Sequence, residues 1–205
     1  MIRIFALIAV IGVYFVAMSE VLAVEFVFKE KHDTVLVLGK FELGDDKKFV
    51  EFLEEVAADP DNTVTNVALE SGGGNFVTGV WMSLMISDLG FTTQTFGYGC
   101  YSACAVVWMA GTETEQMLGE DGSPAPVGFH GPRDDEFNRD PTADAIMAWV
   151  VGYHGYSPLM ALDIIEAVDP DGGNDIILLT PEQKDEWEWG KRAHRAPDAT
   201  FDDLR

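Results

Sequence analysis

Basic residues are scarce in this chain of 205 residues, which has 13 lysines and arginines against 35 aspartates and glutamates. The resulting formal net charge of -22 repels nucleic-acid phosphates and anionic lipid headgroups. Binding to nucleic acid or to a membrane surface is therefore disfavoured. Apolar residues make up 47% and charged residues 23%, which is typical of a globular domain and not of a disordered chain.

The sequence also lacks an apolar run of the roughly 20 residues that a membrane-spanning helix needs. Ile4 to Met18 is apolar but shorter, follows the positive Arg3, and is followed by the small-residue site Val21-Leu22-Ala23. This pattern predicts a secretory signal peptide over residues 1–23 and a periplasmic or secreted mature protein. An uncleaved anchor is the alternative, and it is the one membrane attachment that the sequence suggests.

Cysteine is almost absent, with Cys100 and Cys104 as the two examples. In an exported protein an even pair predicts a disulfide, and two small buried thiols are the alternative. A single C-x-x-x-C segment supplies too few ligands for a tetrahedral zinc site, so no metal site is expected.

Hydrophobic patterns predict one α/β domain over residues 24–196, followed by an acidic tail over 197–205. The alternation implies repeated right-handed β-α-β units and a mostly parallel sheet, with helices packed outside it. In the helix at 76–88, Val77, Val80, Trp81 and Leu84 share one face. Strands are expected at 34–38, 64–69, 91–96, 125–129 and 176–179, and helices at 45–56, 76–88, 102–109, from 141, from 158 to about 168, and at 181–190.

Three segments at the ends of expected strands carry residues suited to catalysis. Gly72 to Gly74 follow the second strand, where glycines allow close approach to a ligand and leave N–H groups free at a helix start. Ser102 stands where a strand enters a buried helix, and the amide of Ala103 there is able to donate to an oxyanion. A tight turn and a helix cap are the alternative uses of these two segments.

His130 is the third candidate, because it ends an expected strand between Gly128-Phe129 and Gly131-Pro132. A histidine in that position is well placed as a general base. His32, His154 and His194 are interpreted as surface or structural histidines.

The order and spacing of these segments resemble the proteolytic subunit of Clp protease, within the crotonase-like superfamily. Ser71-Gly72-Gly73-Gly74 and Gly79 are similar to the S-P-G-G-x-x-x-x-G segment of that family. The serine at a helix start follows about 30 residues later, and the histidine about 30 after that. The C-x-S-A-C segment is closer still to an exported group of Clp-like proteins. The resemblance covers roughly residues 34–190.

The resemblance implies Ser102 as the nucleophile and His130 as the general base. It implies Gly74 and Ala103 as oxyanion donors, with Gly73 in the same substrate-binding loop. For the third member of a triad it implies Asp175, with Asp171 close behind.

The sequence departs from the family at Gly72, which replaces a proline, and at an insertion around Gly119 to Pro124. Its middle helices do not match those that build the Clp double ring, so no ATPase partner is expected.

These residues are compatible with two functions. The first is a serine hydrolase, a peptidase acting on an extended peptide or protein without a cofactor, which is able to form a homo-oligomer. The second is a non-catalytic Clp-like module that binds a partner in the same groove. Crotonase-type acyl-CoA chemistry is disfavoured by the acidity and by export. The order Ser…His…Asp and the absence of a G-x-S-x-G elbow disfavour an α/β-hydrolase.

Overall fold

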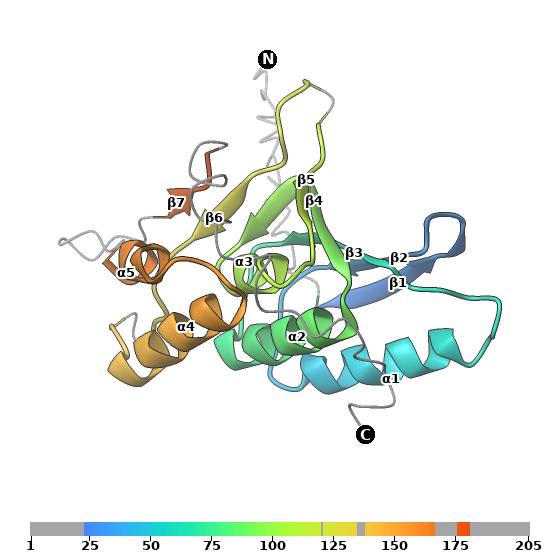
Figure 1. Ribbon diagram of the computed structural model, residues 1–205, viewed down its shortest axis with the longest axis horizontal. Coiled ribbons are helices and arrows are strands. Elements are labelled where there is room, and N and C mark those ends of the chain that lie inside the picture. The colour runs from blue at the N-terminus through green and yellow to red at the C-terminus, as the bar shows by residue number, and fades with distance from the viewer. Residues whose placement is uncertain (1–22, 120, 135–137, 167–175, 181–205) are drawn as a thin grey trace, which may run out of the picture.

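The strands of the protein form one mixed sheet (Figure 1). The computed structural model describes residues 23–119, 121–134, 138–166 and 176–180. Within these ranges seven strands pair in the order β1-β2-β3-β4-β6-β7, and β5 also pairs with β4. The strands are β1 (Glu25–Lys29), β2 (Thr34–Leu38), β3 (Asn66–Ser71), β4 (Thr92–Tyr101), β5 (Thr114–Gln116), β6 (Val127–Phe129) and β7 (Ile177–Leu178).

The central pairings are parallel, as the alternation of elements predicted. β2 with β3, β3 with β4, β4 with β5 and β4 with β6 run parallel. The outer strands β1 and β7 pair antiparallel with β2 and β6. The expected fold class is therefore confirmed: repeated β-α-β units build a mostly parallel sheet with helices packed against it.

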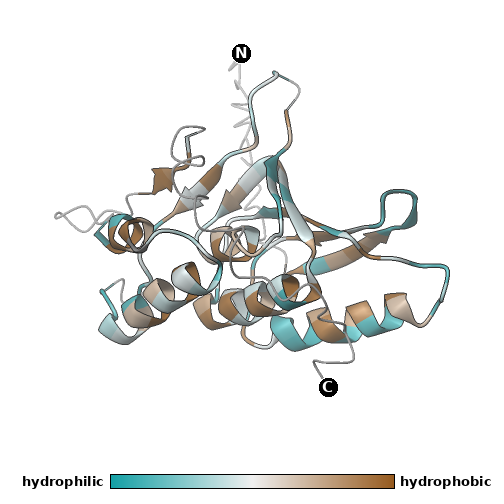
Figure 2. Cartoon of the chain, in the orientation of Figure 1, coloured by the Kyte–Doolittle hydropathy of each residue, from teal (hydrophilic) through white to brown (hydrophobic). Residues whose placement is uncertain are grey.

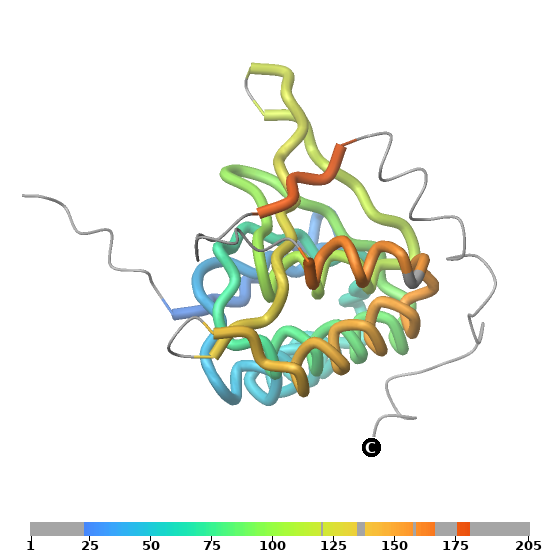
Figure 3. The backbone as a smooth tube through the Cα atoms, turned by 90° about the vertical axis from the view of Figure 1, so that its left-hand side faces the viewer, coloured from blue at the N-terminus to red at the C-terminus, as the bar shows by residue number. Residues whose placement is uncertain are grey.

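Helices α1, α2 and α4 lie side by side on one side of the sheet (Figures 1 and 3). The short helix α3 is completely buried and contacts α2 and the strands β3, β4 and β6. In α1, the helix expected at 45–56, the buried residues Phe49, Leu53 and Val56 lie four and three positions apart and so share one face. The helices are α1 (Asp45–Ala57), α2 (Phe76–Leu89), α3 (Ala103–Trp108), α4 (Pro141–Tyr153) and α5 (Pro158–Glu166), with a 3-10 turn at Glu30–His32.

Helix α2 does not bury the face that its apolar spacing suggested. Val77 and Trp81 are 47% and 54% exposed, although Val80 of the same face is buried. The face that packs on α3 includes Gly79, where an added Cβ would lie 2.7 Å from the Ala103 carbonyl oxygen. Small residues there allow close helix packing, so the larger side chains point outward. Figure 2 shows α2 apolar over most of its surface, whereas α1 alternates between apolar and polar residues.

Strand β4 is longer than the strand expected at 91–96. The prediction that the strand ends before the glycines was wrong. It continues to Tyr101 through Gly97 and Gly99, whose φ angles are 57° and 103°. Its register with β3 shifts at this point, from Leu69 opposite Thr95 to Ser71 opposite Cys100. The shift places four residues of β4, Phe96 to Gly99, opposite the single residue Glu70 of β3, and β4 then leads through Ser102 into α3.

Several predicted features lie outside the described residues. These are the signal peptide, Asp171, Asp175, the helix at 181–190 and the acidic tail. Among the helices that the structure does describe, none combines the length and the apolar character required to span a bilayer.

Candidate active site

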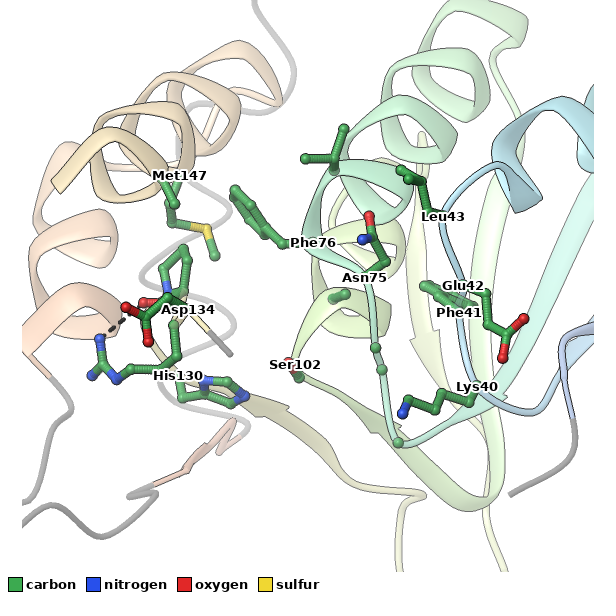
Figure 4. Close-up of a pocket in the computed structure, with 18 of the residues that line it drawn as sticks. Lys40, Phe41, Glu42, Leu43, Asn75, Phe76, Ser102, His130, Asp134 and Met147 are labelled. Carbon is green, nitrogen blue, oxygen red and sulfur yellow. Dashed lines mark hydrogen bonds between the residues drawn. The ribbon is translucent and has the colours of Figure 1, made fainter. Parts of the chain in front are cut away.

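The three candidate segments meet at one end of the sheet. β3, β4 and β6 are parallel neighbours, so their carboxyl ends lie along one edge. The glycine loop, Gly72 to Gly74, follows β3, whereas Ser102 follows β4 and His130 follows β6. All three segments line a single pocket of about 1010 Å³ (Figure 4). The pocket also includes Gly73, Gly74 and Ala103, so the described candidates for catalysis and oxyanion binding are together.

Ser102 occupies a strained turn between β4 and α3. Its backbone angles are φ 57° and ψ -125°, a conformation that residues other than glycine rarely adopt. The turn is held by the Ser102 amide, which donates to the Gly128 carbonyl at 2.8 Å. Strain of this kind is typical of functional sites, where the surrounding structure enforces it.

The Ser102 hydroxyl does not cap α3. No side-chain hydrogen bond joins Ser102 to the first turn of that helix. The alternative interpretation of this serine as a helix cap is therefore wrong for this structure. The side chain is half-buried and lines the pocket.

A disulfide spans the turn that carries Ser102. Cys100 in β4 and Cys104 in α3 are bonded, with their Cα atoms 5.3 Å apart. Both residues are fully buried. The predicted disulfide is confirmed, and it links the strand and the helix on either side of the serine.

The glycine loop packs directly against this turn. Gly73 has a φ of +91°, and an added Cβ there would lie 2.7 Å from the Cβ of Ser102. The Gly73 amide donates to the Ser71 hydroxyl at 3.0 Å, and its carbonyl accepts from the Phe41 amide at 2.9 Å. Gly73 is thus fully engaged and positions the loop.

Two other amides of the pocket remain available to a ligand. Within the ranges that the structure covers, neither the Gly74 nor the Ala103 amide donates a hydrogen bond. Ala103 is the first residue of α3, where an N–H has no partner in its own helix. These are the two amides that the sequence suggested as oxyanion donors.

His130 is half-buried and faces the pocket from the end of β6 (Figure 4). Its Nδ1 is 2.8 Å from the carbonyl oxygen of Gly131. That contact is the ring's hydrogen bond within the described chain, and no hydrogen bond joins His130 to Ser102. Catalytic hydrogen bonds of this kind are often long before a substrate binds.

The rest of the pocket is divided between apolar and charged side chains. Figure 4 shows Phe76 and Met147 facing each other above Ser102, and Lys40 and Glu42 on the wall beside the glycine loop. Tyr98 lies at the same wall, where burial, and then the nearby Glu70, raise the pKa of its hydroxyl. The hollow offers apolar space next to the serine and polar groups along its length, as an extended peptide requires.

A second serine–histidine pair, which the sequence did not reveal, lies away from the pocket. His154 is buried at the end of α4, and its Nε2 is 3.0 Å from the hydroxyl of Ser83 in α2. Ser83 donates to the Val80 carbonyl at 2.7 Å, so its oxygen accepts from the His154 ring. The pair joins two helices, in agreement with a structural role for His154. No group of residues suited to holding a metal ion occurs in the part of the chain described.

No protein-family model matches the chain, and no curated protein matches it either. Solved structures do match, among them the 1510-N membrane-bound stomatin-specific protease in a serine-to-alanine mutant form. The two chains are 13% identical, with a TM-score of 0.49 over 75% of this chain and 73% of the other.

Proposed function

We propose that this protein is an exported serine hydrolase of Clp-like type, a peptidase that uses Ser102 as its nucleophile and His130 as its general base. The observation that carries the proposal is the geometry of Ser102. The residue is held at positive φ in a strand-to-helix turn, its hydroxyl does not cap the helix, and two unused amides line the same pocket. A serine that served only to cap α3 would need none of these features.

In the proposed reaction, His130 takes the hydroxyl proton as Ser102 Oγ attacks the carbonyl carbon of a peptide bond. The amides of Gly74 and Ala103 donate to the oxyanion that forms. The protonated histidine then gives its proton to the leaving amine as the C–N bond breaks, which leaves an acyl-enzyme. Water, deprotonated by the same histidine, releases the acid and regenerates the serine.

The disulfide supports the exported location. Cys100 and Cys104 are buried and bonded, and such bonds persist in the periplasm or outside the cell. N-terminal sequencing of protein from the non-cytoplasmic fraction tests this part of the proposal. A chain that begins near Val24 is expected, whereas an intact Met1 in a washed membrane pellet would indicate an anchor.

A second candidate function is a non-catalytic module that binds a peptide in the pocket. The observation that favours it is the missing hydrogen bond between His130 and Ser102 in the described structure. A fluorophosphonate probe separates the two functions, because it labels an activated serine and ignores an unactivated one.

We expect the wild type to label, Ser102→Ala to lose all labelling and His130→Ala to lose most of it. Ser83→Ala is the matched control, since it removes the hydroxyl of the other serine–histidine pair, and it should label as the wild type does. If the folded wild-type protein does not label, the hydrolase function is refuted and the peptide-binding module is the function that stands.

A further inference from the structure

We propose that the backbone carbonyl of Gly131, not an aspartate, orients the imidazole of His130, so that the site works as a Ser102–His130 dyad. The inference rests on the proposed function and replaces one part of the family pattern. The resemblance to Clp protease implied Asp175 or Asp171 behind the histidine. Both aspartates lie outside the described residues, and within those residues the group that meets Nδ1 of His130 is the Gly131 carbonyl.

The hydrogen bond to Gly131 determines which ring nitrogen carries the proton. A carbonyl oxygen only accepts hydrogen bonds, so Nδ1 of His130 must donate across the 2.8 Å contact. A neutral imidazole has one N–H, and Nε2 therefore holds the free lone pair. That nitrogen is the one able to take a proton from Ser102. The carbonyl thus performs the task of selecting the tautomer, which an aspartate performs in a triad.

The Gly131 peptide is fixed well enough to perform this task. Gly131 is buried against α5, where an added Cβ would lie 3.2 Å from the Ile165 carbonyl oxygen. Gly131 precedes Pro132, and the proline ring restricts the backbone of Gly131 to extended conformations. Arg133 then donates from Nη1 to the Pro132 carbonyl at 2.9 Å, which closes the segment. Before His130, the pairing of Phe129 with Ile177 of β7 fixes the other end.

The two aspartates that line the pocket with His130 are engaged elsewhere. Asp134 accepts from the Asn138 amide at 2.8 Å. Asp140 caps α4 and accepts from the amides of Thr142 and Ala143 at 2.8 and 3.3 Å. Neither aspartate bonds to the histidine ring. Within the described chain, the acceptor that the imidazole reaches is the neutral carbonyl.

The first test measures the tautomer directly. Nitrogen-15 NMR of histidine-labelled protein should show neutral His130 with its proton on Nδ1, and His130→Gln assigns the signal among the four histidines. A proton on Nε2, or a rapid average of the two tautomers, would overturn the proposal. This measurement does not depend on activity, so it decides the orientation of the ring even if the protein proves not to be a hydrolase.

The second test asks whether an aspartate is required. Asp171→Asn and Asp175→Asn, alone and together, should keep the rate of fluorophosphonate labelling within about twofold of the wild type. Loss of a true triad aspartate leaves the wrong tautomer and reduces the rate by as much as about 10⁴-fold. A fall of roughly 10²-fold or more in either variant, with the fold intact, would therefore restore the triad. If the wild type itself fails to label, the proposed function fails, and the NMR result still stands.

Discussion

Replacement of Gly73 by alanine should damage both the stability and the reactivity of the protein. The φ of +91° costs an alanine about 1–3 kcal/mol relative to glycine. The new Cβ would also lie 2.6 Å from the Tyr101 carbonyl oxygen and 2.7 Å from the Cβ of Ser102. These atoms belong to the turn that the disulfide closes, so they are not free to move away, and the overlap adds about 1–3 kcal/mol.

The combined loss of about 2–6 kcal/mol in the free energy of unfolding corresponds to a fall of roughly 4–24 °C in Tm for a domain of this size. Because the loop has to shift away from Ser102, the Gly74 amide moves as well. Misplacing an oxyanion donor should reduce fluorophosphonate labelling by about 10²-fold. Circular dichroism melts and timed labelling measure the two effects separately.

Gly72→Ala is the matched control. An added Cβ at Gly72 meets nothing within 4 Å, and its φ is not positive. Alanine there should change stability by less than about 1 kcal/mol, on the stabilising side, because it restricts the unfolded chain. The prediction is refuted if Gly73→Ala has the same Tm as Gly72→Ala and labels at the wild-type rate. The close packing of the loop against the serine turn would then not be what positions the catalytic groups.

Three further predictions concern the disulfide, a tyrosine and the buried histidine. Replacing both cysteines by alanine should lower the free energy of unfolding by about 2 kcal/mol, which is the chain-entropy value for so short a loop. It should also slow fluorophosphonate labelling, because the disulfide no longer fixes the turn that carries the serine. Urea melts measure the first effect and timed labelling the second. The hydrogen bond from Tyr153 to Asp88, at 2.7 Å, raises the pKa of Tyr153 from its usual value near 10 to about 12. The stability it gives is complete below pH 10 and is lost as the pH rises from 10 to 12. Tyr153→Phe should therefore lower Tm slightly at neutral pH and flatten the fall in Tm between pH 10 and 12. Ser83→Ala removes the acceptor of the buried His154 ring and should cost about 1–3 kcal/mol, seen as a lower urea midpoint, whereas an unchanged midpoint would show that the ring finds another acceptor.

The parts of the fold that could be predicted from the sequence have strong periodicity. β2 was expected at 34–38 and lies there, and the helix expected at 45–56 is α1, Asp45–Ala57. Strands β1 and β5 were not predicted. β5 has three residues, too few for a pattern, and it is a strand because β4 offers it a free edge. Tertiary pairing of this kind leaves no local signal.

The outward-facing Trp81 shows a different limit. Helix α2 is apolar on almost every side, so the pattern indicates a helix but not which face is buried. The decision is made by Gly79, which lets the helix approach the Ala103 backbone. Close packing of small residues outweighs the burial of larger ones here.

In the pocket, the grouping of Ser102, His130 and the glycine loop followed from one rule, that parallel strands end at the same edge of a sheet. The positive φ of Ser102 has no signal in its residue type, because serine rarely adopts it. The contact of His130 with the Gly131 carbonyl was missed for a similar reason. Every residue has the same peptide carbonyl, so a backbone acceptor leaves no trace in the sequence.

The parallel order of β3, β4 and β6 ties the pocket to the completion of folding. A hairpin cannot join two parallel strands, so each of these three strands is reached through a crossover connection. The glycine loop, Ser102 and His130 are therefore distant in sequence, and they come together in space only when all three strands have paired. A partly folded molecule, or one still emerging during synthesis, has at most two of the three segments in place. Labelling of the serine would therefore count the molecules that have finished folding.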